Sequence, residues 1–283
     1  LMWNAEYNLF LNDPKSALLK GSYSITNNST TQFYDANISL ISGNINFDNN
    51  KPFPKDTKNR MKLASQAGEL YGSESSMPSY LQTEDYHIFK MPKKITISPE
   101  SQRQYEFLLK KDIPYKKTYH ISHSIRRYRK KLTKNEKIPI NTKIELKAKD
   151  IANFQLPAGS FKIYENINET LTYIGGEKST IKQNNDIIKI NTGNTRDAVC
   201  EFFIKSHEIN RNHEETEINA IFTNNKNDEI IITMTENFYD GGWEIFQTNI
   251  EYERIDAYTA KFNLTIPANS KKEISFKARI EKN

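Results

Sequence analysis

Apolar residues recur at every second position along most of this chain, and that period constrains the fold more than any other feature. Near the start, Trp3, Ala5, Tyr7 and Leu9 alternate with polar neighbours, and similar runs recur almost to the last residue. Successive side chains of an extended strand point to opposite faces, so this alternation predicts strands that bury one face. Runs with the 3.6-residue period of a helix are nearly absent. The sequence therefore predicts an all-β protein.

The supply of residues fits a folded protein. The chain has 283 residues, enough to bury a core without disulfides, and its 15 Tyr and 15 Phe argue against wholesale disorder. Cys200 is the only cysteine, and its neighbours Phe202 and Phe203 predict a small core residue rather than a reactive thiol. No run reaches the roughly 18 apolar residues of a membrane-spanning helix, and no signal-peptide pattern precedes Trp3.

Turn-forming clusters divide these runs into regions. We predict two or three immunoglobulin-like antiparallel β-sandwich units with a flexible insertion, which the loop-like composition before Ser79 indicates. The predicted regions are the first strands of an N-terminal sandwich (1–43), the insertion (44–79), a β-rich middle region that completes this sandwich and holds a basic hairpin (80–205), and a C-terminal immunoglobulin-like sandwich (206–283).

Proline is expected to separate strands in the middle region. Pro114 lies between the runs 105–108 and 115–121, where its missing N–H would cost no ladder hydrogen bond. The runs 187–190 and 199–204 are likewise interpreted as separate strands.

Positive charge is concentrated in one stretch. Residues 90–150 hold 18 Lys and Arg against 6 Asp and Glu, a net charge of +12 in a chain of net charge +5. The densest cluster around Tyr128 consists of Arg126, Arg127, Arg129, Lys130 and Lys131. These side chains are candidates for binding an anionic ligand, such as lipid headgroups or an acidic polysaccharide. The alternative is a solvated hairpin, and because no recognised nucleic-acid module is present, nucleic acid is an unlikely partner.

A second candidate is the turn that holds Tyr239, Asp240 and Trp243. At the rim of a sandwich, the two rings would stack on a sugar and Asp240 would bond its hydroxyls. The alternative is a Gly-Gly turn that directs Trp243 into the core, which suits the large area of a tryptophan side chain.

Catalytic and metal-binding signatures are absent from the sequence. No G-x-S-x-G nucleophile motif occurs. His120 and His123 lie on a predicted strand, where positions three apart face opposite sides. His207 and His213 have acidic neighbours but no third ligand at a standard spacing. We therefore nominate no catalytic residue, metal or cofactor, and a carboxylate pair cannot be chosen among 35 acidic residues.

Several short motifs follow one another in a recognisable order. They are W-N-A-E-Y (3–7), N-N-S (27–29), D-A-N-I-S-L-I-S-G (35–43), L-P-A-G with K-I-Y (156–164), R-D-A (196–198), G-W-E-I (242–245) and I-P-A (266–268). In this order the chain resembles the bacterial family catalogued as domain of unknown function 4139, the C-terminal part of mucoidy-inhibitor-A-like proteins. Asn4 replaces the family's usual Arg, and Gly175-Gly176 carries one Gly more than its pattern. The resemblance implies a β-rich, immunoglobulin-like fold and no established reaction.

The expected function is that of a non-enzymatic structural or protein-interaction module, with a bacterial envelope or secreted location favoured over the cytoplasm. Edge strands of such sandwiches accept strands from protein partners. The alternatives are an anionic-ligand binder that uses residues 126–131 and a carbohydrate-active hydrolase or accessory domain.

Overall fold

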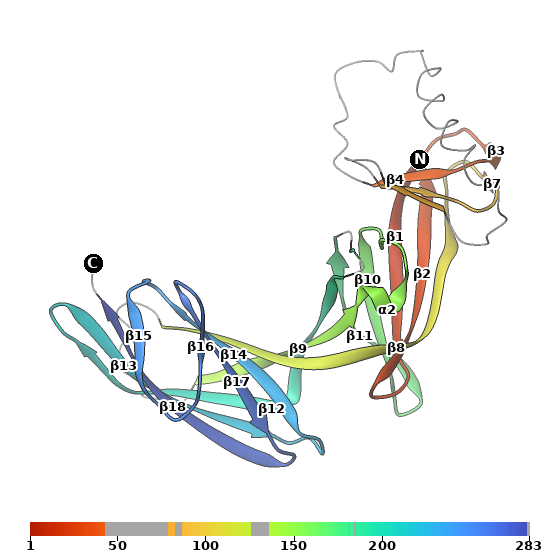
Figure 1. Ribbon diagram of the computed structural model, residues 1–283. Coiled ribbons are helices and arrows are strands. Elements are labelled where there is room, and N and C mark those ends of the chain that lie inside the picture. Colours follow the sequence, from red (N-terminus) through yellow and green to blue (C-terminus); the bar gives the residue numbers. More distant parts are fainter. Residues whose placement is uncertain (43–78, 83–86, 126–135, 181, 184, 282–283) are drawn as a thin grey trace.

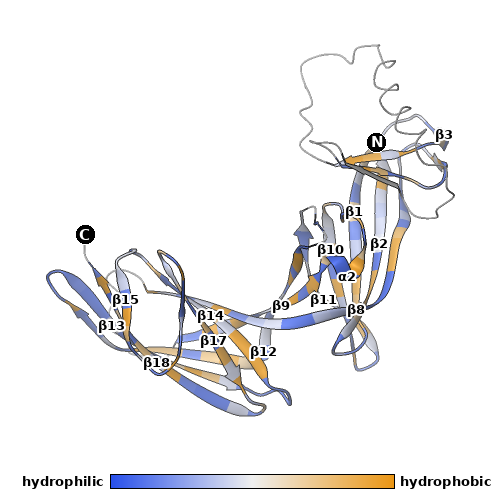
Figure 2. Cartoon of the chain, viewed as in Figure 1, coloured by the Kyte–Doolittle hydropathy of each residue, from blue (hydrophilic) through white to orange (hydrophobic). Residues whose placement is uncertain are grey.

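The computed structural model describes residues 1–42, 79–82, 87–125, 136–180, 182–183 and 185–281 (Figure 1). Strands make up 75% of the structure and helix 2%, which confirms the all-β prediction. Apolar and polar residues alternate along the strands in Figure 2, as the period of two requires. Apart from Ser79, the predicted insertion 44–79 lies outside the described residues.

The first lobe is built around one hydrophobic core that includes Tyr7, Tyr23 and Phe161. Its main sheet has the order β11 (Thr170–Ser179), β10 (Gly159–Ile167), β1 (Met2–Leu11), β2 (Ser16–Asn27) and the first half of β8 (Ser101–Ile125). β1 and β10 run parallel, whereas the other neighbours are antiparallel. The inner face of this sheet packs on Ile144, Ile188 and the short helix α2 (Ala148–Ile151).

Short strands complete this lobe. β3 (Phe33–Ala36) pairs with β7 (Ile95–Ile97), and β6 (His87–Lys90) lies between β4 (Ser39–Ser42) and β5 (Ser79–Gln82). Leu40 and Phe89 from these strands belong to the first core. The Trp3 ring meets Tyr23 of β2 and Phe89 of β6 edge-on, with centroids 5.7 and 6.1 Å apart, so it links the main sheet to these short strands.

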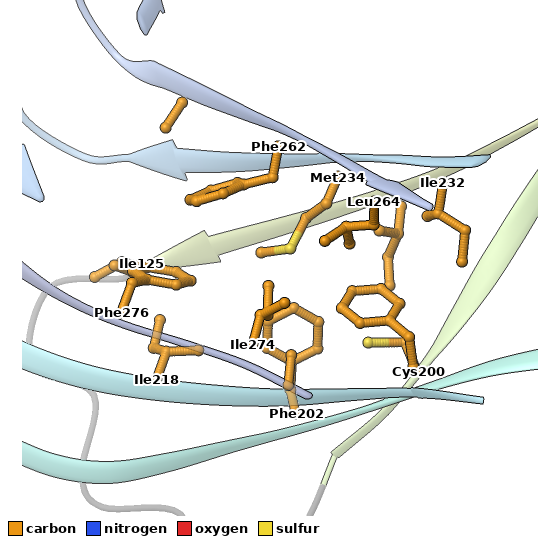
Figure 3. Close-up of a cluster of buried hydrophobic side chains, with 14 of the residues drawn as sticks. Ile125, Cys200, Phe202, Ile218, Ile232, Met234, Phe262, Leu264, Ile274 and Phe276 are labelled. Atoms are coloured by element: carbon orange, nitrogen blue, oxygen red, sulfur yellow. The ribbon is translucent and has the colours of Figure 1, made fainter. Parts of the chain in front are cut away.

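The second lobe has two layers of strands around a separate core (Figure 3). Ile232, Met234, Phe262 and Leu264 of one layer face Phe202, Ile218, Ile274 and Phe276 of the other. One layer contains β16 (Glu253–Asp256), β17 (Thr259–Ile266), β14 (Ile230–Phe238) and the end of β8. The other contains β9 (Glu136–Lys147), β12 (Ile187–Ile209), β13 (His213–Asn224), β18 (Ser270–Glu281) and β15 (Trp243–Thr248). Cys200 is fully buried here, as predicted, and burial raises the pKa of its thiol.

Strands β8, β9 and β12 run through both lobes (Figure 1). β8 pairs with β2 as far as Pro114, with β9 from Tyr115 to His120, and with β14 from Tyr119 to Ile125. The prediction of separate strands around Pro114 is therefore wrong: the proline lies where the strand changes partner and needs no ladder N–H. Similarly, β12 is continuous from Ile187 to Ile209, with its bends at bulges near the left-handed Gly193.

The two cores do not divide at the predicted boundary between residues 205 and 206. Ile121, Ile140 and Phe202 belong to the second core, although the middle region was expected to complete the N-terminal sandwich. The reason is the passage of β8, β9 and β12 from one core to the other, which no local sequence pattern marks.

A buried asparagine ends β2 in the first lobe. The Asn27 amide donates to the carbonyl oxygens of Thr31 and Ser98 at 2.8 and 2.9 Å, and its Oδ1 accepts the N–H of Ser29. The Ser101 hydroxyl donates to the Ser98 oxygen at 2.6 Å. Asn27 therefore joins the turn after β2 to the chain that enters β8.

The second lobe repeats this arrangement at the end of β13. The Asn224 amide donates to the carbonyl oxygens of Asp228 and Pro267, both at 2.9 Å, and its Oδ1 accepts the N–H of Lys226. The Ser270 hydroxyl donates to the Pro267 oxygen at 2.8 Å. Each of these bonds has its counterpart around Asn27, and the local ones recur at the same spacing of two, three or four residues. The bonds that join the two chain segments span 71 residues in the first lobe and 43 in the second.

The surrounding backbone matches as well. Glu100 and Asn269 precede β8 and β18, and both are left-handed, with φ of 46° and 49°. The pair Phe33 and Ile97 of the first lobe corresponds to Ile230 and Ile266 of the second. The two lobes thus repeat one structural unit in which β1, β2 and the start of β8 correspond to the end of β12, β13 and β18.

Candidate interaction surface

The basic candidates Arg126, Arg127, Arg129, Lys130 and Lys131 lie outside the described residues. The flanking strands end at Ile125 and begin at Glu136. Binding of an anionic ligand through this stretch stays a prediction from the sequence.

The turn with Tyr239, Asp240 and Trp243 directs its tryptophan into the core. Trp243 is 4% exposed, and its ring stacks on Phe238 with centroids 4.2 Å apart. Its indole N–H donates to the Ala257 oxygen at 2.7 Å, and the Arg254 guanidinium lies 4.1 Å from the ring centroid. Both ring faces are covered, so Trp243 offers no face to a sugar. Tyr239 packs against the same core, and Asp240 accepts the N–H of Gly242 within the turn.

Two histidines, His123 and His207, each lie close to a buried glutamate, which the sequence did not reveal. His123 Nδ1 lies 2.6 Å from Glu236 Oε2, and its ring stacks on Phe202. His207 bonds Thr216 through Nδ1 at 2.9 Å, and its Nε2 lies 4.0 Å from Glu214 Oε2. Both carboxylates are buried inside the second lobe, which favours a structural polar layer. No set of three His, Cys, Asp or Glu in the described residues is arranged to hold a metal ion.

A hollow of about 300 Å³ lies on the first lobe, between the end of β11 and the start of β12. Phe161 and Ile190 form its floor, and Lys178, Lys182 and Lys189 stand around it. The buried Glu214 and Glu236 do not line this hollow. Glu177 is the one acid among its lining residues, so this hollow holds no pair of carboxylates.

The outer face of the first lobe carries a strip of apolar side chains across five neighbouring strands. We call Phe10, Leu18, Leu109, Tyr164, Leu171 and Tyr173 the apolar strip. Phe10 on β1 pairs with Leu18 on β2 and with Tyr164 on β10, which pairs with Tyr173 on the edge strand β11. Leu171 and Tyr173 are each 57% exposed, and Leu109 is 50% exposed.

The rings in this strip cover one another. Phe10 stacks on Tyr164 at 5.3 Å, and Tyr164 meets Tyr173 edge-on at 5.8 Å. The Lys20 ammonium lies 5.8 Å from the Phe10 centroid. The aromatic faces of Phe10 and Tyr164 are therefore occupied, and the exposed part of the strip consists mainly of leucine side chains and Tyr173. That surface suits the side chains of a protein better than the flat face of a sugar.

A fixed polar row borders the apolar strip on the same sheet face. Glu6 Oε2 accepts the Gln104 amide at 3.0 Å and lies 3.5 Å from Lys162 Nζ. An apolar centre with a polar border is the usual anatomy of a protein interface.

The apolar strip has a sequence signal that the analysis of alternation passed over. Where a strand buries every second residue, an apolar residue between two buried ones must face outward. The runs Leu9-Phe10-Leu11 and Ala17-Leu18-Leu19 have this form, with the middle residue outward in each. Interrupted alternation on neighbouring strands was therefore a usable indication of the surface.

No protein-family model matches this chain, and no curated protein matches it. The resemblance to the family of unknown function 4139 therefore stays a prediction. The single described helix, α2, has four residues, and no helix in the described ranges is long and apolar enough to cross a membrane.

Proposed function

We propose that this protein is a non-enzymatic, immunoglobulin-like β-sandwich module of the bacterial envelope that binds a protein partner through the apolar strip. The observation that carries the proposal is the strip itself: six apolar side chains on one sheet face, bordered by fixed polar groups. Contiguous exposed apolar surface of this kind marks protein interaction sites, because burying it on association releases ordered water.

Further support comes from the interior. Two histidines that a catalytic centre could use, His123 and His207, instead lie against the buried carboxylates of Glu236 and Glu214. The 4139-like motifs point the same way, since that family carries no established reaction.

A photo-crosslinking residue at position 171 in the native bacterium tests the proposal. We expect it to trap a specific protein, whereas the same residue at position 231, an exposed site on the second lobe, traps none. With the trapped protein purified, Leu171→Lys should weaken binding at least tenfold and Ile231→Lys should change it less than twofold. Equal trapping at both positions, or turnover of a peptide or glycan library by the purified protein, would refute the proposal.

The charge of residues 90–150 favours a second function, binding of an anionic polymer or surface through residues 126–131. Affinity for vesicles of anionic lipid should then fall steeply as salt rises, and reversing the charges at Arg126, Arg127 and Arg129 should abolish it. Binding that ignores both changes would rule this function out.

A further inference from the structure

The repeated unit is completed differently in the two lobes. In the second lobe, β15 pairs with β18 between Phe276 and Ile280. β18 corresponds to the first half of β8, because both strands follow matched turns and begin at matched serines. Among the described strands, only β2 pairs with β8 before Tyr115. The edge of β8 that corresponds to the β15 position is therefore without a described strand.

The side chains on this edge are exposed, and its lysines have no ion-pair partner among the described residues. Leu109 of the apolar strip is 50% exposed, and the exposed Lys110 and Lys111 form no ion pair with a described residue. In the second lobe the corresponding cation, Arg279, pairs with Glu244 of β15 at 2.9 Å. The strand that occupies the second-lobe position thus supplies both backbone pairing and a carboxylate.

A hollow lies beside this part of β8, at its seam with β2. It has a volume of about 240 Å³ and is lined by Ala17, Leu18, Lys111 and Asp112, together with Asn12 and Ser16. Leu18 belongs to the apolar strip.

We infer that an extended segment of the partner protein adds to β8 along Glu106–Lys111. This inference rests on the proposed function and specifies how the partner docks. The segment pairs through its backbone and places an apolar side chain beside Leu109 and a carboxylate beside Lys110 or Lys111. Strand addition draws affinity from main-chain hydrogen bonds and specificity from alternate side chains. Lys110 and Lys111 deter uncharged strands and favour a segment with a carboxylate beside them.

The β15 sequence supplies a probe, because it fills this position in the second lobe. We would titrate the full chain with a peptide of residues 242–249, G-W-E-I-F-Q-T-N, and measure amide hydrogen exchange. Exchange within residues 106–111 should slow at least tenfold at saturation, while exchange within 276–280 stays unchanged. No slowing at millimolar peptide would overturn the inference. So would amides on this edge that are already protected in the free chain, since the edge would then be covered by the chain itself.

A charge exchange provides the matched control. Replacing the peptide's glutamate with lysine should weaken binding at least fivefold, and the double variant Lys110→Glu, Lys111→Glu should recover it. The control variant Lys271→Glu, Lys272→Glu in the second lobe should bind the original peptide as the parent does. Binding that ignores the exchange would also overturn the inference. The proposed function is judged separately at Leu171, on the opposite end of the apolar strip, so either can fail alone.

Discussion

The two lobes share one structural unit and treat its outer surface in opposite ways. On the second lobe, Arg279 bridges Glu215 and Glu244, and its guanidinium covers the Phe246 ring at 5.0 Å. On the first lobe, the same side of the sheet carries Phe10, Leu109 and the rest of the apolar strip. A unit that has its edge strand and its charge pairs has no need of a partner. On the first lobe, the described residues supply neither a second strand beside the first half of β8 nor an ion pair for Lys110 and Lys111, and we expect binding there.

The lobes also differ in their interiors. The second core accommodates two buried carboxylates beside His123 and His207, whereas the buried polar groups of the first lobe include Ser24 and Asn27. Burying a carboxyl group lowers the stability of a fold unless the group is paired, so each buried carboxyl group in the second lobe depends on its histidine neighbour. This difference leads to three predictions about stability.

The largest effect is expected from a ring in the second core. Phe262 is fully buried, and its ring centroid lies 5.2 Å from that of Phe276. Phe262→Ala should therefore lower the free energy of unfolding by about 3–5 kcal/mol. Because β8, β9 and β12 contribute residues to both cores, the substitution should destabilise the first lobe together with the second. Trp3 and Trp243 report on separate lobes, so urea unfolding of Trp3→Phe and Trp243→Phe proteins measures each lobe. Two distinct midpoints would contradict the coupling.

An intermediate effect is expected from the two buried asparagines. Asn27→Ala and Asn224→Ala each remove several hydrogen bonds and leave carbonyl oxygens unsatisfied, which should cost about 2 kcal/mol apiece. Thermal unfolding would compare them with Asn28→Ala, an exposed neighbour that should change little. If only one of the two buried sites is costly, the repeat does not have the same energetic role in both lobes.

The smallest effect is expected on the loss of stability at acidic pH. The hydrogen bond from Arg279 holds the pKa of Glu215 below its ordinary value of 4.5. A lowered carboxyl pKa stabilises the fold above that value, and the contribution disappears as the pH falls through the folded pKa. Urea unfolding between about pH 5 and 3 should therefore lose less stability in Arg279→Met than in the parent. Lys111→Met, on the first lobe, should follow the parent profile, and a parallel shift there would argue for a general charge effect.

The sequence was informative where structure depends on neighbouring residues. Alternation revealed the strands, and the buried Cys200 followed from its apolar neighbours. Pairing between distant strands carried no local signal, so neither the His123–Glu236 pair nor the passage of β8 between cores could be predicted. The strand break expected at Pro114 does not occur, because a proline interrupts a strand only where a backbone N–H is needed for a ladder hydrogen bond. The repeat had a faint trace, Asn-Asn at 27–28 and at 224–225, which an Asn-rich composition obscured.

Strands shared by both cores have a mechanical consequence. Turning one lobe against the other would require three backbones to bend together, with the breakage of ladder hydrogen bonds between them. The two lobes should therefore keep a fixed orientation relative to each other instead of moving independently. A protein held at one end would keep a fixed direction relative to whatever meets the other end.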